Sequence, residues 1–273
     1  MSFNQYKIMR LAFIIILITL QLTSCENSGS ADNSDTANSD TMVNHWNVLI
    51  SKYPDSLILK ENLLQHFRDQ NQLNQAINSV DAYLKNDSLN ARLWSIKAVL
   101  HYENEDTSSS INAFEKAISI TPNMTDLQSL GSLYAGITHP RTKEITQIMR
   151  NVYAEKSEKE ALFIEGTYLK GLLEYAKAIQ LFDQCIELEF SFMEAYREKA
   201  QCQMALYQYK AARITMERAV QLQNNYLDGW FLLGQICEEL LDKTAAEAAY
   251  RRILLYDAQH EEAKERLKAL GIS

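Results

Sequence analysis

The sequence predicts an all-α fold, and two observations carry that prediction. Only three prolines and eight glycines occur in 273 residues, which is few for a protein made of many tight turns. Helix-favouring Ala, Leu, Glu, Gln and Lys recur instead, and similar residue types return every 34 residues over most of the chain. With 47% hydrophobic and 23% charged residues, the composition is that of a globular protein and excludes collagen-like, disordered and disulfide-scaffold classes.

The N-terminal segment has the layout of a secretory signal. Lys7 and Arg10 are the only charges in the first ten residues, and the apolar run 11–20 follows them. A permanent anchor helix is the alternative, but it would need about 20 apolar residues to span a bilayer. Polar residues at 21, 23 and 24 end the run too early for that.

The tetrapeptide Leu22-Thr23-Ser24-Cys25 directly follows this run and resembles the lipobox of bacterial lipoproteins. In that family the cysteine is lipidated and the signal is cut just before it. The resemblance therefore implies a lipoprotein signal peptide over residues 1–24 and a lipid anchor at Cys25, which several acyl chains would make stable. A chance cysteine near an ordinary cleavage site is the alternative.

A flexible linker is predicted after this cysteine, over residues 25–41. Residues 26–40 contain Ala as their only hydrophobic type, so they cannot bury enough surface to offset the entropy of ordering. The net charge of the chain is -8, which makes nucleic acid an unsuitable partner because phosphates require a basic stripe. We expect membrane attachment through the lipid and hardly through electrostatics.

The 34-residue period runs through the rest of the chain. A bulky residue recurs at Trp94, Leu162, Tyr196 and Trp230. A small residue follows each of them at Ala98, Gly166, Ala200 and Gly234. A second small position recurs at Ala76, Ser110, Ala178, Ala212 and Ala246, and a large residue follows four positions later at Val80, Phe114, Phe182, Met216 and Tyr250.

This pattern resembles the tetratricopeptide repeat, whose signature is Trp-x2-Leu-Gly-x2-Tyr followed by Ala-x3-Phe and Pro. Residues 230–234 (WFLLG) and 246–250 (AEAAY) carry the clearest copy. The resemblance implies a right-handed α-solenoid of antiparallel helix pairs. Small residues in such pairs let the helix backbones approach, and large residues fill the gaps between neighbouring pairs.

The solenoid is expected to occupy residues 42–273. A half repeat over 42–56 precedes six repeats over 57–260, and the charged segment 261–270 is expected to cap the last hydrophobic face. The repeat over 125–158 departs most from the pattern. Its opening lies one residue early, its second helix lacks Ala-x3-Phe, and His139-Pro140 indicates a longer loop, so either a bend or a mobile joint is expected there.

No catalytic or metal-binding motif appears, so the chain is not expected to be an enzyme or to hold a cofactor or metal. HExxH, CxxC, glycine-rich phosphate loops and Gly-x-Ser-x-Gly are all missing from the sequence. His101 and Glu105 lie four residues apart, but neighbouring acidic residues favour a solvated turn. Cys185 and Cys202 fall on consecutive helices and are either buried thiols or a disulfide.

In tetratricopeptide proteins the first helix of each repeat lines the concave surface, which implies where a protein or peptide partner would bind. Exposed aromatic and Met side chains beside Arg, Lys and Gln would supply apolar anchors and directional hydrogen bonds. An ordinary solvated helix face with a few stray hydrophobic residues is the alternative. The residues concerned are Arg92, Tyr102, Phe163, Lys170, Arg197, Gln201, Met204, Phe231 and Gln235.

The leading functional hypothesis is a bacterial scaffold, lipid-anchored in the cell envelope, that mediates protein–protein interactions during assembly of an envelope complex. The chain is similar to tetratricopeptide lipoproteins that help to assemble outer-membrane machinery. The outer membrane is the favoured location, facing either the periplasm or the exterior, because Glu26 follows Cys25 where an inner-membrane retention signal would place Asp. The alternative is an outer-membrane lipoprotein that binds a glycan or peptide ligand.

Overall fold

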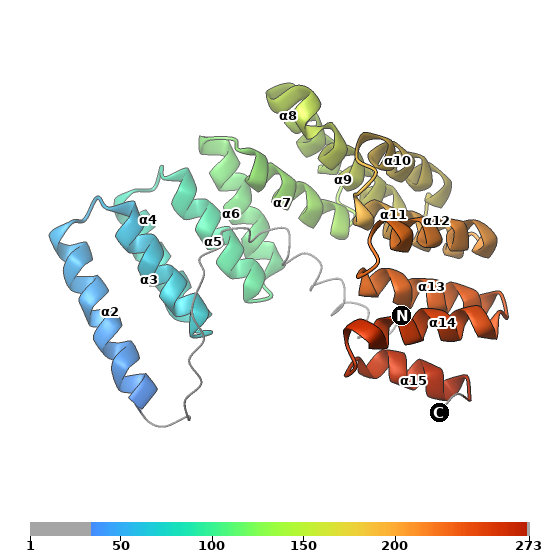
Figure 1. Ribbon diagram of the computed structural model, residues 1–273. Helices are drawn as coiled ribbons and strands as arrows, with labels where there is room; N and C mark the ends of the chain where they lie inside the picture. The colour runs from blue at the N-terminus through green and yellow to red at the C-terminus, as the bar shows by residue number, and fades with distance from the viewer. Residues whose placement is uncertain (1–33, 272–273) are drawn as a thin grey trace. The chain divides into compact units, whose positions relative to one another are not determined.

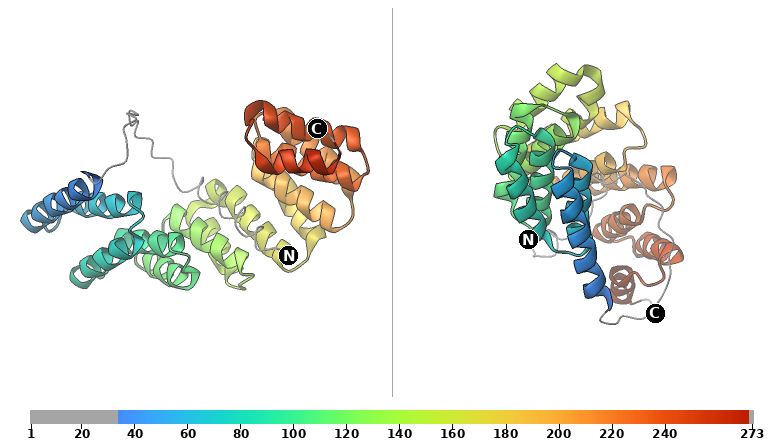
Figure 2. Two further views of the ribbon diagram at one scale, coloured as in Figure 1. Left: turned by 90° about the horizontal axis from the view of Figure 1, so that it is seen from below. Right: turned by 90° about the vertical axis from the view of Figure 1, so that its left-hand side faces the viewer.

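The computed structural model describes residues 34–271, which divide into two compact units at Leu63 and Leu64. In the first unit the structure describes α2 (Ser34–Lys52) and the opening turns of α3 (Leu57–Asp69). The second unit contains the remaining helices, which follow one another from α4 to α15 (Figures 1 and 2). Only helices, turns and irregular segments occur among the described residues, so the all-α prediction is confirmed.

The second unit is a succession of helix pairs, as expected for an α-solenoid. Consecutive helices pack against each other throughout it, and α9 also contacts α11, which contacts α13. After α4 (Leu73–Asn86) come the pairs α5 (Ala91–Glu103) with α6 (Thr107–Ile120), α7 (Met124–Gly136) with α8 (Thr142–Tyr153), α9 (Glu158–Gly171) with α10 (Tyr175–Leu188), α11 (Met193–Ala205) with α12 (Tyr209–Leu222), α13 (Leu227–Glu239) with α14 (Lys243–Tyr256), and then α15 (Glu261–Ala269).

Small residues bring the two helices of a pair together, as the sequence period predicts. At Gly234 an added Cβ would lie 2.5 Å from the ring of Tyr250, and at Gly166 it would lie 2.7 Å from the ring of Phe182. Both aromatic rings are fully buried. The small and large positions of the repeat are therefore partners in one contact, in which a ring of the second helix packs on the bare backbone of the first.

Each helix pair turns at a residue with positive φ. Asn71, Glu105, Leu173, Tyr207 and Leu241 have φ between 55° and 64°, and successive members are 34 residues apart, or 68 between Glu105 and Leu173. Thr138, with φ 53°, takes this place in the deviating repeat. Asp106 and Asp242 follow two of these turns, and their side chains accept a hydrogen bond from the backbone N–H three residues on. The 34-residue period is therefore visible in the backbone as well as in the core.

The deviating repeat, 125–158, has a buried core of its own. Ile145 and Met149 of α8 are fully buried and stand where other repeats carry the small and large residues. The bare backbone of Gly131 makes room for the larger Ile145, whose Cγ2 would lie 3.3 Å from a Cβ added there. A 3-10 turn, Ala154–Ser157, then leads into α9. One buried cluster runs from Ala98 through α7 and α8 to Tyr168, which favours a fixed joint over a mobile one.

The N-terminal boundary differs from the sequence prediction. Helix α2 begins at Ser34, so the last residues of the segment 25–41, expected as a flexible linker, are helical. The signal peptide over 1–24 and the lipidated Cys25 lie outside the described residues. Across residues 34–271, no helix is both long and apolar enough to cross a bilayer.

The three cysteines of the solenoid are free thiols buried in the core. Burial raises the pKa of Cys185 and of Cys202 to about 12 and also raises the pKa of Cys237. Of the two sequence alternatives, the structure has the buried thiols and not the Cys185–Cys202 disulfide. A thiol with such a pKa is protonated at neutral pH and behaves as a small hydrophobic group.

Candidate partner-binding site

Three consecutive first helices, α9, α11 and α13, place nine residues on a regular grid. Each helix contributes residues at i, i+4 and i+7, and equivalent residues of neighbouring helices are 34 apart. The grid consists of Phe163, Thr167 and Lys170, then Arg197, Gln201 and Met204, then Phe231, Gln235 and Glu238. We call this set the first-helix face. All nine side chains belong to residues of intermediate exposure, so a partner could reach them without unfolding the helices.

An ion-pair network crosses this face and centres on Glu198, a residue that the sequence analysis did not single out. Its Oε2 accepts a hydrogen bond from Lys170 Nζ at 2.6 Å, and its Oε1 accepts one from Arg197 Nη2 at 3.3 Å. Lys170 Nζ also donates to Gln201 Oε1. Arg197 Nη1 lies 4.0 Å from Asp228 Oδ2 at the start of α13. Two of the predicted site residues, Lys170 and Arg197, are thus joined through one carboxylate, and Lys170 links the third, Gln201.

The electrostatics of this network follow from its burial. Glu198 is 9% exposed, and burial alone would raise its pKa, but the charges of Lys170 and Arg197 hold the pKa of this carboxyl below its usual range. Burial likewise acts to lower the pKa of Arg197, and Glu198, Tyr226 and Asp228 more than offset this, so it is raised. The charges of Glu198 and Arg197 therefore persist at neutral pH in a poorly solvated place, where charge interactions are stronger than in water.

The aromatic residues of the face are partly committed to the core. Phe163 lies with its ring centroid 5.0 Å from that of Phe192 and 5.7 Å from that of Phe182. Phe231 lies 5.6 Å from Tyr250 and 6.0 Å from His260. They therefore present one surface to solvent and pack the other against neighbouring helices, which makes them rigid anchors for a partner.

The remaining residues of the first-helix face differ in how firmly their side chains are held in place. Arg266 from α15 pairs with Glu238, and its Nε donates to Glu238 Oε1 at 3.0 Å. Met204 packs at the border of the buried cluster of this region. Met204, Gln201 and Gln235 carry neither a charge nor an aromatic ring, so substituting them leaves the ion pairs and the core aromatics of the face in place.

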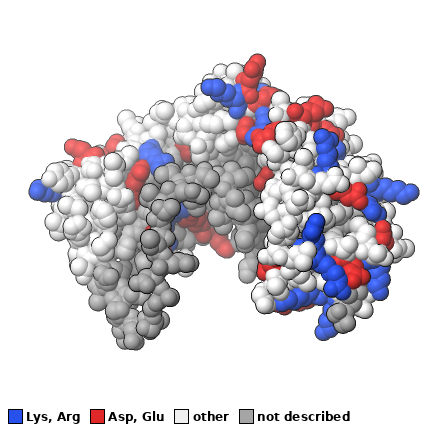
Figure 3. Space-filling view, in the orientation of Figure 1, with Lys and Arg blue, Asp and Glu red and all other residues white. Residues whose placement is uncertain are grey.

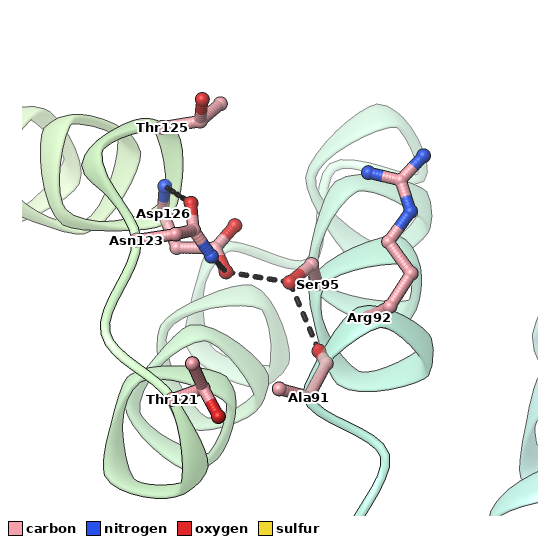
Figure 4. A pocket seen from close by; sticks show the side chains of 7 residues that line it. All are labelled: Ala91, Arg92, Ser95, Thr121, Asn123, Thr125 and Asp126. Carbon is pink, nitrogen blue, oxygen red and sulfur yellow. Dashed lines mark hydrogen bonds between the residues drawn. The ribbon is translucent and has the colours of Figure 1, made fainter.

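Arg92 and Tyr102 of α5 lie apart from the grid, in the first complete helix pair of the second unit. Tyr102 packs at the border of the buried cluster that includes Ala98. Arg92 is exposed and lines a cavity of about 330 Å³ between α5 and α7 (Figure 4). The structure thus brings seven of the nine predicted residues onto one face and places these two elsewhere.

A second buried carboxylate, Asp126, lies in the wall of this cavity. Its Oδ2 is 2.5 Å from Ser95 Oγ and 2.5 Å from Asn123 Nδ2, and its backbone N–H donates to Asn123 Oδ1 at 2.9 Å (Figure 4). Ser95 Oγ also lies 3.0 Å from the carbonyl oxygen of Ala91. The carboxylate is thus held by neutral donors, and the Arg92 side chain projects from α5 at the other side of the cavity, as Figure 4 shows.

The sequence held a signal for both buried carboxylates. Glu198 stands at the repeat position that carries the buried Ile164 and Leu232 one period away. Asp126 stands, allowing for the one-residue shift of its repeat, where Ala161 and Ala195 are fully buried. A charge at a position that is apolar in the neighbouring repeats marks an interaction beyond packing.

The charged surface is mixed in sign. Over the helices of the C-terminal half, Lys and Arg lie side by side with Asp and Glu on the face shown in Figure 3. Many of them form pairs between helices, such as Lys199 with Asp183 at 2.5 Å and Arg213 with Asp242 at 2.9 Å. No group of three or more His, Cys, Asp or Glu that could hold a metal ion occurs between residues 34 and 271.

Comparison with known proteins identifies the repeat. Residues 62–125 and residues 227–265 each match a family model described as tetratricopeptide repeat. No curated protein sequence matches the chain. A solved tetratricopeptide repeat protein from Parabacteroides merdae is similar with a TM-score of 0.66 and 18% identity, over 86% of this chain and 93% of that one.

Two further solved structures are also similar. PilW, described as a widely conserved type IV pilus biogenesis factor, has a TM-score of 0.63 and 18% identity over 77% of this chain and 97% of its own. PilF of Pseudomonas aeruginosa has a TM-score of 0.55 and 13% identity over 85% of this chain and 99% of its own. At such identities the likeness establishes the fold alone. The two family matches and the succession of helix pairs show that the chain contains tetratricopeptide repeats within an α-solenoid.

Proposed function

We propose that this protein is a lipid-anchored scaffold of a bacterial cell envelope, which binds a protein partner on the first-helix face of α9, α11 and α13. The observation that carries the proposal is the regular grid of half-exposed Phe, Met, Gln, Lys and Arg side chains on adjacent helices. Apolar anchors supply binding free energy and the polar groups supply direction, which is the composition of a protein interface.

The network around Glu198 supports this role because it preorganises the face. Lys170 and Arg197 are held in place by the carboxylate before any partner arrives, so less side-chain entropy is lost on binding. Lys170 carries three N–H donors and Arg197 five, and not all of them are used by Glu198 and Gln201. We expect the remaining donors to recognise carbonyl or carboxylate groups of a partner segment.

The anchor in this proposal is Cys25, with the mature protein attached to the outer membrane on its periplasmic or external side. The support is the lipobox-like Leu22-Thr23-Ser24-Cys25 behind the apolar run 11–20. Mass spectrometry of the N-terminal peptide and membrane fractionation test it. Cys25→Ala is expected to release the protein from membranes, and recovery of this variant in the membrane fraction would contradict the anchor.

The partner-binding role is tested by crosslinking in intact cells, followed by affinity capture and mass spectrometry. The test variant is Gln201→Ala, Met204→Ala, Gln235→Ala, which changes the face and removes the Lys170–Gln201 hydrogen bond while leaving the ion pairs of Glu198 and the core aromatics in place. The matched control is Lys116→Ala, Gln180→Ala, Arg251→Ala, three exposed residues of second helices. Loss of one reproducible partner in the test variant alone supports the proposal, whereas equal capture by both variants contradicts it.

A second candidate function is binding of a small polar ligand, and the cavity beside Asp126 is the observation that favours it. Its walls offer a buried carboxylate, a guanidinium and the Thr121 and Thr125 side chains within about 330 Å³. Such groups could hold a sugar or a peptide end by hydrogen bonds. Calorimetry with a glycan and dipeptide panel tests this: binding that Asp126→Ala abolishes supports a ligand receptor, and no heat with any compound opposes it.

A further inference from the structure

The turns that join first to second helices carry unexpected side chains in three consecutive repeats. At the turn residue, Leu173, Tyr207 and Leu241 have φ of 64°, 59° and 59°. Positive φ favours Gly and Asn and disfavours residues with a bulky side chain. The same position holds polar residues, Asn71 and Glu105, in the first two repeats, so the apolar choice is confined to the C-terminal part of the solenoid.

These three side chains are also among the most exposed apolar groups of the described chain. Leu173 is 68% exposed, Tyr207 81% and Leu241 91%. Ile137, 51% exposed, extends the set at the turn of the deviating repeat. A positive φ does not favour large side chains, and such exposure leaves little packing within the chain beyond the edge-on contact of the Tyr207 ring with Tyr209. We call these four residues the turn edge.

The turns of neighbouring repeats lie next to each other, so the turn edge is a row. Thr138 lies where a Cβ on Gly171 would stand, which places the deviating turn against the Leu173 turn. Lys170, three residues before Leu173, reaches Glu198 and Gln201 of α11, the helix that ends at the Tyr207 turn. Arg213 of α12 in turn pairs with Asp242 at 2.9 Å, beside Leu241.

A lysine follows every turn of this row. Lys143, Lys177, Lys210 and Lys243 are all exposed and are spaced 33 or 34 residues apart. Lys177 pairs with Glu174 at 2.5 Å, while Lys210 and Lys243 form no ion pair within the described part of the chain. The row therefore combines projecting Leu, Ile and Tyr side chains with cationic groups a few residues away.

We infer that the turn edge is a membrane-contacting surface, which inserts its apolar tips into the interfacial region of a phospholipid bilayer while the lysines reach the anionic headgroups. Leu and Tyr beside Lys are the residue types that bind at this depth, where an apolar body and a polar or charged end are both satisfied. The inference builds on the proposed lipid anchor, which would hold the solenoid close enough to the bilayer for a weak contact to form.

The form of the edge favours a bilayer over a protein partner. Its side chains project from separate turns, one per repeat, and so do not line a common groove. A folded partner would need a matching pocket for each tip, whereas the fluid interface of a bilayer adapts to them. The overall charge of -8 argues against attraction of the whole molecule, so the contact depends on the local lysines and apolar tips.

The test uses the full-length protein, purified from membranes and reconstituted into vesicles of phosphatidylethanolamine and phosphatidylglycerol with brominated acyl chains. Tyr207→Trp reports on the turn edge, and Glu105→Trp is the matched control at the same turn position of a polar repeat. Both variants also contain the native tryptophans, so the quenching measured for the wild-type protein is subtracted from that of each variant. The expected result is quenching by brominated lipid at 207 and none at 105.

Further variants test whether the quenching depends on the turn edge or on exposed leucines anywhere on the solenoid. Adding Leu173→Ser and Leu241→Ser to Tyr207→Trp is expected to abolish most of the quenching. Adding Leu188→Ser and Leu222→Ser should leave it unchanged, because these exposed leucines lie near the far ends of the second helices. Quenching that survives the first pair, or that is lost with the second pair, would overturn the inference.

The outcomes also distinguish this inference from the anchor itself. If the protein is acylated but residue 207 is not quenched, the anchor is supported and the membrane contact of the turn edge is rejected. If residue 207 is quenched although residue 25 carries no acyl group, the membrane contact of the turn edge is supported and the anchor is rejected. If residue 207 is protected from solvent labelling in intact cells but shows no quenching in vesicles, a protein covers the edge and the inference is wrong.

Discussion

At Glu198, two cations offset the cost of burying a carboxylate. Lys170 approaches from the neighbouring repeat and Arg197 from the adjacent position of the same helix. Removing one partner of such a group leaves the others as uncompensated, poorly solvated charges, which costs more than the intact interaction contributes. The residue therefore serves less to stabilise the fold than to fix two basic side chains on the first-helix face.

The first prediction concerns Glu198→Gln, which removes the charge and keeps the shape. At neutral pH we expect a loss of about 2–3 kcal/mol in the free energy of unfolding, below the usual range for a fully buried pair because Lys170 and Arg197 are partly solvated. Urea unfolding checks it. Glu198→Leu combined with Lys170→Met should recover much of the loss, since the neighbouring repeats carry Ile164 and Leu232 at that position.

The lowered pKa of Glu198 also predicts how the stability of the wild-type protein and of Glu198→Gln depends on pH. The folded pKa lies below the usual value of 4.5, so the stabilising contribution is fully present above about that pH and is lost as the pH falls through the folded value. The stability difference between wild type and Glu198→Gln should therefore narrow on acidification below pH 4.5. A difference that grows in acid would show that the carboxyl is not charged in the fold.

The second residue-scale prediction concerns Leu241, whose side chain is almost fully exposed at φ 59°. Leu241→Gly removes the left-handed strain of roughly 1–2 kcal/mol and adds about 0.5–1 kcal/mol of backbone entropy to the unfolded chain. We expect a net stabilisation of about 0.5–1 kcal/mol, measured as a higher Tm. Glu105→Gly, at the same turn position of another repeat, should behave alike, and a lower Tm for both would refute the strain argument.

At the scale of elements, helix pairs depend on the contact between a small residue and a large ring. Gly234→Ala would place a Cβ 2.5 Å from the Tyr250 ring, so the ring or the helix must move, and we expect a loss of about 1–3 kcal/mol. Gly136→Ala is the control, because nothing lies within 4 Å of its Cβ position near the end of α7. That variant should gain about 0.5–1 kcal/mol from helix propensity. Chemical denaturation compares the two.

The helix pairs could be predicted because their contacts are local in sequence and repeated. Gly166 with Phe182 and Gly234 with Tyr250 are 16 residues apart, so one period contains the whole interaction. In the deviating repeat the same contact was missed, since Ile145 and Met149 replace the expected residue types and Gly131 compensates for the larger side chain. Compensation between two positions is invisible to a search for either residue alone.

The site was predicted less completely because it depends on contacts between repeats. First-helix positions could be assigned to one face from the period, which placed Lys170, Arg197 and Gln201 near each other. Their common partner, Glu198, sits at a core position, and a pattern that assigns core positions to apolar residues passes over it. Likewise, the sequence does not mark Leu173 and Leu241 as exposed turn residues, because only the backbone shows that they occupy a left-handed turn.

At the scale of the whole molecule, stability in a solenoid spreads only between neighbouring repeats. Each helix pair of the second unit contacts the pairs before and after it, so a lesion at one end should act locally and fade with distance. Helix α15 is the terminal element of this succession. It buries Ala263 and Leu267 in the cluster that contains Tyr250 and Ile253, and its outer side is charged.

The last prediction therefore concerns how far along the solenoid a local loss of stability spreads. Leu267→Ser uncovers the hydrophobic face of α14 and should cost about 2–3 kcal/mol locally. Hydrogen exchange is expected to accelerate in α13, α14 and α15 and to stay unchanged in α5 and α6. Lys268→Ser, at an exposed position of the same helix, controls for helix propensity. Uniform acceleration from α5 to α15 would mean that the second unit unfolds as one cooperative body, and the nearest-neighbour description of its stability would fail.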